Sequence, residues 1–115
     1  MKIGLNLEGT NLETLDGIDN KEFYELTISS KMKNLDSLKD LKIDTLIIQD
    51  NDYLYDLTNI PELSFRLYLI NNRNLMTMKG LRTDIPYVMV TNKNGVYKKI
   101  DKETAFLKHY TIFGE

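Results

Sequence analysis

A short alternation of apolar and polar residues recurs five times along the chain. Each copy places a variable residue between two apolar ones, as in a β-strand that buries one face. The first apolar residues of the copies stand 21, 20, 21 and 21 residues apart and are Leu5, Leu26, Leu46, Leu67 and Val88. A period kept through five copies is typical of a repeat protein, whose stacked copies bury a core that no copy could bury alone.

A second pattern, with an apolar residue at every third position, follows each of the first four copies. Its members are Leu12, Leu15 and Ile18, then Leu35, Leu38 and Leu41, then Leu54, Leu57 and Ile60, then Leu75, Met78 and Leu81. A period of two followed by a period near three predicts a strand, a turn and a tight 3₁₀-like or irregular return segment. A further apolar residue leads into most strands, at Phe23, Ile43, Leu63 and Ile85.

The two central copies, residues 46–54 and 67–75, resemble the leucine-rich repeat family. Each has a strand of alternating apolar residues, an asparagine at the following corner (Asn51 and Asn72) and a leucine behind it. The resemblance covers roughly residues 3 to 96 and implies an α/β solenoid of about five turns with a short parallel β-sheet. Five amphipathic strands of an unrelated α/β or all-β domain are the alternative.

The other corner positions depart from the family pattern. They carry Thr10, Lys31 and Lys93 where an asparagine would stand. We therefore expect the ladder of corner asparagines to be interrupted outside the two central copies.

No linker or low-complexity tract divides the chain, so we expect a single domain over residues 1–115. Repeats would occupy about 3–95, and residues 96–115 would form a C-terminal cap. Residues 96–100 are predicted to add a strand, and Asp101 to cap a short helix from Lys102 to about Tyr110. A solenoid needs such a cap because its last turn would otherwise expose apolar residues.

Composition excludes several classes of protein. The 115 residues are 42% hydrophobic and 28% charged, which is ordinary for a folded domain and unlike a disordered chain. The absence of cysteine excludes disulfides and thiolate metal sites, and His109 is the single histidine. Neither a secretory signal nor an apolar run of membrane-spanning length is present, so we expect a cytoplasmic protein with no membrane partner.

Motifs for catalysis or cofactor binding are missing from the sequence. It contains neither of the glycine-rich phosphate-binding motifs, and no nucleophile motif accompanies His109, which lies in the predicted cap helix. Residues 50–52 form an acidic corner, but they lack the glycine and the later glutamate of an EF-hand loop. We predict no metal, no cofactor and no enzymatic activity.

Large apolar side chains recur at positions that face away from the predicted core. In successive strands, the outward positions form three columns: Gly4, Glu25, Thr45, Arg66 and Tyr87; Asn6, Thr27, Ile47, Tyr68 and Met89; Glu8, Ser29, Gln49, Ile70 and Thr91. The amino-terminal part of this face is polar. The carboxy-terminal part forms what we term the strand-face patch, which consists of Ile47, Arg66, Tyr68, Ile70, Tyr87 and Met89.

The strand-face patch has the composition of a protein interface, since Tyr, Met and Arg are enriched there. The sequence thus predicts a non-catalytic protein-binding module, an inhibitor or an adaptor. Frequent Asn, Lys, Ile and Tyr are typical of AT-rich genomes and favour an origin in a bacterial virus. The alternative for the patch is a second small core, covered by the C-terminal cap folding back over it.

Charge is unevenly distributed along the chain. Residues 1–60 contain 12 acidic and 6 basic residues, whereas residues 61–115 contain 5 acidic and 9 basic residues, for a formal net charge of -2. This asymmetry is compatible with steering of a partner or with head-to-tail self-association. It also supplies the alternative function, a nucleic-acid-related role through the lysine-rich C-terminal end or by acidic mimicry.

Overall fold

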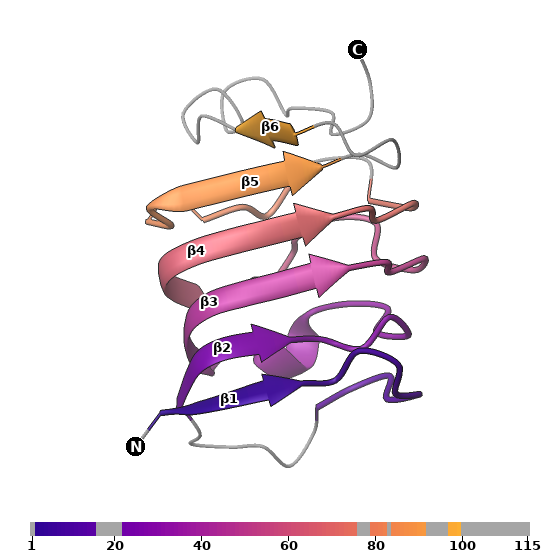
Figure 1. The fold of residues 1–115 in the computed structure, drawn as a ribbon, viewed down its shortest axis with the longest axis horizontal. Helices are drawn as coiled ribbons and strands as arrows, with labels where there is room; N and C mark the ends of the chain where they lie inside the picture. Colours follow the sequence, from indigo (N-terminus) through magenta and orange to yellow (C-terminus); the bar gives the residue numbers. More distant parts are fainter. Residues whose placement is uncertain (1, 16–21, 76–78, 83, 92–96, 100–115) are drawn as a thin grey trace.

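The chain folds as a β-solenoid, here in a computed structural model that describes residues 2–15, 22–75, 79–82, 84–91 and the backbone of 97–99. Its six-stranded sheet follows sequence order and consists of β1 (Ile3–Asn6), β2 (Glu22–Thr27), β3 (Lys42–Gln49), β4 (Glu62–Ile70), β5 (Tyr87–Thr91) and β6 (Tyr97–Lys99) (Figure 1). Strands β1 to β5 are parallel, and β6 is antiparallel to β5. The parallel strands delimit about four turns.

The inward columns predicted from the alternation are confirmed. Strand register places Leu26, Leu46, Leu67 and Val88 side by side, and it does the same for Ile48, Leu69 and Val90. All of these residues and Ile28 are at most 3% exposed, as are the four lead-in residues Phe23, Ile43, Leu63 and Ile85. Stacking of equivalent residues from successive turns therefore forms the core.

The return segments contain much less helix than the α/β expectation implied. Among the described residues, the one helix is a single 3₁₀ turn, η1 (Asp36–Leu38), and the other return segments are turns and irregular backbone. The described residues therefore show a β-solenoid of about four turns, and they do not confirm the α/β label or the fifth turn. An apolar residue at every third position suits the three-residue repeat of 3₁₀ structure, and segments this short do not complete an α-helix.

Strands β3 and β4 bend near their starts (Figure 1). In β3 only two residues separate the inward-facing Ile43 and Leu46. Strand β4 carries one residue more: Ile43 pairs with Leu63 and Thr45 pairs with Arg66. The extra residue forms a β-bulge at the bend, and register is restored from Arg66 onwards.

The chain turns at Asp50 and Asn51 after β3, and at the equivalent residues Asn71 and Asn72 after β4. Asp50 and Asn71 both adopt positive φ, at 53° and 52°, and the Asn71 side-chain amide donates to the Asp50 carboxylate at 2.8 Å. The next residue in each turn, Asn51 or Asn72, is buried. Asn72 Nδ2 donates to the carbonyl of Ile48 at 2.8 Å. The Asn72 bond thus satisfies a backbone carbonyl close to the corner, and the Asn71 bond connects the side chains of the two turns.

Ser29 extends this hydrogen-bonded series toward the N-terminus and corrects the outward position expected for this residue. Its hydroxyl donates to the carbonyl of Thr10 at 3.0 Å and accepts from the Lys31 amide at 3.1 Å. Ser29 was expected on the outer face but is 0% exposed, because β2 ends at Thr27 and the alternation stops there. The asparagine ladder is interrupted at the corner position Lys31, as expected, and a buried serine two residues earlier makes the hydrogen bonds of this turn.

The predicted C-terminal cap is described only at its beginning. Strand β6 lies within the strand expected over residues 96–100 and pairs with β5. The helix expected from Lys102 to about Tyr110, with His109 in it, lies outside the described residues.

Candidate functional site

The structure brings the six residues of the strand-face patch together on three neighbouring strands. Register aligns Ile47, Tyr68 and Met89 across β3, β4 and β5, and it aligns Arg66 with Tyr87. Ile70 follows on the same face of β4, between Gln49 and Thr91. Adjacent strands lie about 4.8 Å apart, so the six side chains form one continuous surface.

Exposure differs among these side chains. Arg66 is exposed, whereas the other five are half-buried. Large side chains at neighbouring positions of adjacent strands cover part of one another. The prediction that these six side chains face away from the core is therefore correct. Part of each side chain is accessible to solvent.

Aromatic rings surround the Arg66 guanidinium. Its central carbon lies 4.5 Å from the centre of the Phe65 ring and 5.9 Å from that of Tyr87. Arg66 Nη1 donates to the Tyr68 hydroxyl at 3.1 Å, and the Tyr68 and Tyr87 rings meet edge to face at 6.5 Å between centres. Cation–π attraction and the hydrogen bond fix the position of an otherwise flexible side chain.

Phe65 adjoins the patch and was missed by the alternation. It is 53% exposed because the bulge in β4 places it at the outside of the bend. One signal was available in the sequence: three residues lie between Leu63 and Leu67, whereas two lie between Ile43 and Leu46. That longer interval marks the extra residue.

The amino-terminal part of the face carries smaller side chains and acidic groups. Thr27 and Thr45 are small and buried beside their larger neighbours. Glu8 accepts a hydrogen bond from the Gln49 side chain at 2.5 Å, and Glu25 is exposed on β2. The face thus changes from acidic at β1 and β2 to aromatic and basic at β4.

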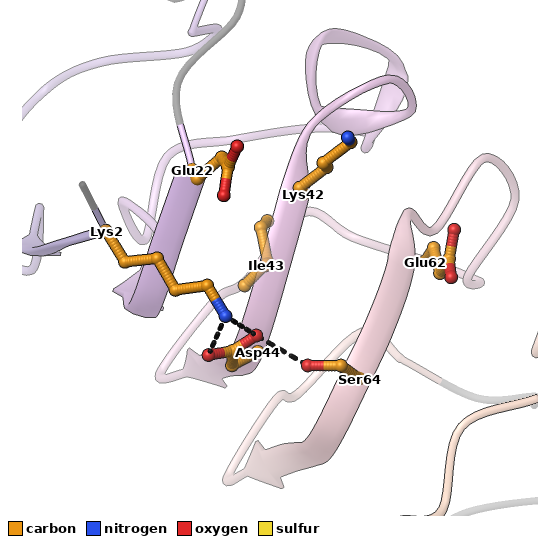
Figure 2. Close-up of a pocket in the computed structure, with 7 residues that line it drawn as sticks. All are labelled: Lys2, Glu22, Lys42, Ile43, Asp44, Glu62 and Ser64. Carbon is orange, nitrogen blue, oxygen red and sulfur yellow. Dashed lines mark hydrogen bonds and ion pairs between the residues drawn. The ribbon is translucent and has the colours of Figure 1, made fainter.

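A pocket lies at the bend of the strands. This open pocket of about 350 Å³ is lined by Lys2, Glu22, Lys42, Ile43, Asp44, Glu62 and Ser64 (Figure 2). Register places Lys42 between Glu22 and Glu62. Alternating charges at equivalent strand positions favour the native register over a slipped one, so this row has a structural explanation.

Asp44 is the most constrained acid of the pocket. It accepts a hydrogen bond from the Ser64 hydroxyl at 2.5 Å and from Lys2 Nζ at 3.0 Å, as Figure 2 shows. The Ser64 hydroxyl and then the Lys2 ammonium hold the pKa of Asp44 below its ordinary value, since both stabilise the carboxylate. A carboxylate held in its ionised form by two donors is a poor general base, and its contacts link three turns of the solenoid.

The described residues do not gather their acidic side chains at one point. They contain no group of three acidic or histidine side chains that could hold a metal ion. The acidic corner instead serves the turn: Asp50 accepts from Asn71, and Asp52 lies 3.9 Å from Arg73 in an exposed ion pair. In the same part of the chain, no helix has the length and apolar character needed to span a bilayer.

Comparisons with models of protein families, with curated protein sequences and with solved structures found no match. Function therefore has to be inferred from the surface of the chain itself.

Proposed function

We propose that this chain is a non-catalytic protein-binding module that docks its partner on the strand-face patch. The observation that carries the proposal is the packing of five large apolar or aromatic side chains on three adjacent strands, on the face opposite the core. Outward positions do not need apolar residues for folding. A contiguous apolar surface with Tyr, Met and Arg at its centre is typical of an interface.

The proposal extends to the kind of module. We propose a leucine-rich-repeat-like architecture, supported by the period of 20 to 21 residues and by the corner asparagines Asn51 and Asn72, which bond the preceding turn. A small module acts on a partner mainly by covering or distorting its surface, so an inhibitor or an adaptor fits best. Residue usage typical of AT-rich genomes supports a viral origin, and the location that we propose with it is the cytoplasm.

A nucleic-acid partner is less well supported by the described face. Arg66 is the one cation among its described outward positions, while Glu8 and Glu25 would repel phosphates. Binding to nucleic acid usually requires several cations that follow the backbone.

The test uses the wild-type chain and Tyr68→Ala as affinity baits in extracts of the native host. Tyr68 lies at the centre of the patch, so its truncation should weaken capture of the partner by about 2 kcal/mol or more, which is roughly 30-fold. Tyr55→Ala is the matched control, because Tyr55 is 58% exposed and lies off the strands. Mass spectrometry of captured proteins and the thermal midpoint of each variant are measured together.

Two outcomes would contradict the proposal. If Tyr68→Ala unfolds the chain, the patch belongs to a core. If Tyr68→Ala remains folded and captures the same protein as strongly as wild type, the interface lies elsewhere.

A further inference from the structure

The single positive charge of the strand-face patch has an unusual environment. The outward positions nearest to Arg66 on β3, β4 and β5 carry uncharged side chains, namely Thr45, Ile47, Tyr68, Tyr87 and Met89. The acid of the same column, Glu25, lies two strands away. Two strand spacings amount to roughly 10 Å, beyond the range of an ion pair.

Arg66 therefore has no carboxylate partner within the described part of the chain. The four ion pairs found there involve Lys2, Lys33, Arg73 and Arg82. Each of those cations has its acid, whereas the polar and cation–π contacts of Arg66 with the described residues are made to aromatic side chains.

The aromatic contacts leave most of the guanidinium's donors available. The group has five N–H donors, and the Tyr68 hydroxyl takes one of them. The rings of Phe65 and Tyr87 supply attraction but accept no conventional hydrogen bond. Because packing already restrains the side chain, an incoming carboxylate would cause little loss of rotamer freedom. A guanidinium binds a carboxylate through two parallel hydrogen bonds, and the surrounding apolar surface reduces competition from water.

We propose that the partner presents an acidic segment to this face, with an Asp or Glu carboxylate paired to Arg66 and apolar side chains on Ile47, Met89 and Ile70. This inference rests on the proposed function and adds the chemistry of the partner. The charge gradient of the face gives the segment a direction, because its acidic part is attracted to β4 and repelled by Glu25 and Glu8 at the other end.

The experiment uses isotope-labelled full-length chain and the probe peptide acetyl-Leu-Glu-Phe-Glu-Leu-amide, with a second peptide that carries Gln in place of both Glu residues. Backbone amide resonances in β3, β4 and β5 are followed by NMR during titration. We expect the Glu peptide to shift these resonances and to bind at least about tenfold more tightly than the Gln peptide, as for a charge-assisted bond.

Three variants locate the effect. Arg66→Gln should abolish the preference for the Glu peptide. Arg66→Lys, which keeps the charge but loses the planar pair of donors, should retain only part of it. Arg73→Gln is the matched control: it removes one exposed arginine, which lies beyond the end of β4, and should leave the preference unchanged.

The outcomes separate this inference from the proposed function. Equal binding of both peptides at the patch would be consistent with a docking surface. It would contradict the inferred pairing of a partner carboxylate with Arg66. If neither peptide shifts these resonances at millimolar concentration, the inference that the partner presents an acidic segment is contradicted. The bait experiment with Tyr68→Ala would still decide whether a protein docks on the patch. A short oligothymidylate is titrated in the same way. If it binds more tightly than the Glu peptide, the inference is contradicted in favour of a nucleic-acid partner.

Discussion

The side-chain oxygen of Asn72 accepts a hydrogen bond from the backbone N–H of Asn51, one turn earlier in the solenoid, at 3.1 Å. Asn51 in turn donates to the carbonyl of Met32 at 2.8 Å and accepts from the amide of Leu54 at 2.8 Å. Both asparagines are at most 1% exposed. Successive turns are thus connected at their corners by buried side-chain amides as well as by the sheet.

Asn51→Ala should strongly destabilise the fold. It removes the partners of the Tyr53 and Leu54 amides and of the Met32 carbonyl. Each buried polar group left unpaired costs about 1 to 3 kcal/mol, so the expected loss is about 3 kcal/mol or more. Urea denaturation followed by circular dichroism measures it. Asn74→Ala, which alters an exposed asparagine bonded to Tyr53, is the control and should change the free energy of unfolding by about 0.5 kcal/mol or less.

Gly80→Ala and Gly9→Ala form a matched pair. Both glycines have positive φ, at 93° and 84°, so alanine strains either position by about 1 kcal/mol. A Cβ on Gly80 would also lie 2.5 Å from the backbone of Leu57, whereas one on Gly9 would meet nothing within 4 Å. Thermal and urea unfolding should show a larger loss for Gly80→Ala, by about 1 to 3 kcal/mol. Equal losses would mean that the close approach between turns is not maintained in solution.

Leu46→Ala and Ile47→Ala test the register directly, since the two residues are neighbours on opposite faces of β3. Leu46 is 0% exposed, and its truncation should cost about 2 to 5 kcal/mol through the cavity that it leaves. Ile47 is half-buried on the outer face, so Ile47→Ala should lower the free energy of unfolding by about 1.5 kcal/mol or less. The reverse order in chemical denaturation would show that the strand faces are interchanged.

Asp44 should make stability depend on pH in the acidic range. Because its pKa is lowered in the folded chain, its contribution is present above the unfolded value of about 3.9 and is lost as the pH falls through the folded value. The pair is partly exposed, so the contribution should be about 1 kcal/mol or less.

The measurement is urea unfolding of wild type and Asp44→Asn at several pH values between 5 and 3. The difference in stability should narrow as the pH drops below about 4. Ser64→Ala removes the hydroxyl that contributes most to the lowered pKa and should reduce the same pH-dependent difference. A difference that stays constant across the range would contradict this assignment.

The repeat, the inward columns and the composition of the strand-face patch followed from the sequence because two apolar periods fix which side of each strand is buried. Once Leu46 and Leu67 face inward, Ile47 and Tyr68 must face outward in the same column. The positions that escaped prediction depend on contacts between turns. Ser29 lies beyond the end of β2 and is bonded to Thr10 in another turn, and Phe65 lies at a bulge defined by comparing β4 with β3. Alternation within one strand contains neither kind of information.

The bulge at the bend of β4 also bears on how such a surface changes during evolution. One additional residue between Leu63 and Leu67 leaves both leucines in the core and restores pairing at Arg66, while Phe65 gains a place outside. Insertion of a single codon at this bend is therefore absorbed within one turn, and the stacking of other turns is preserved. The solenoid can therefore acquire new surface residues one at a time without redesign of its core.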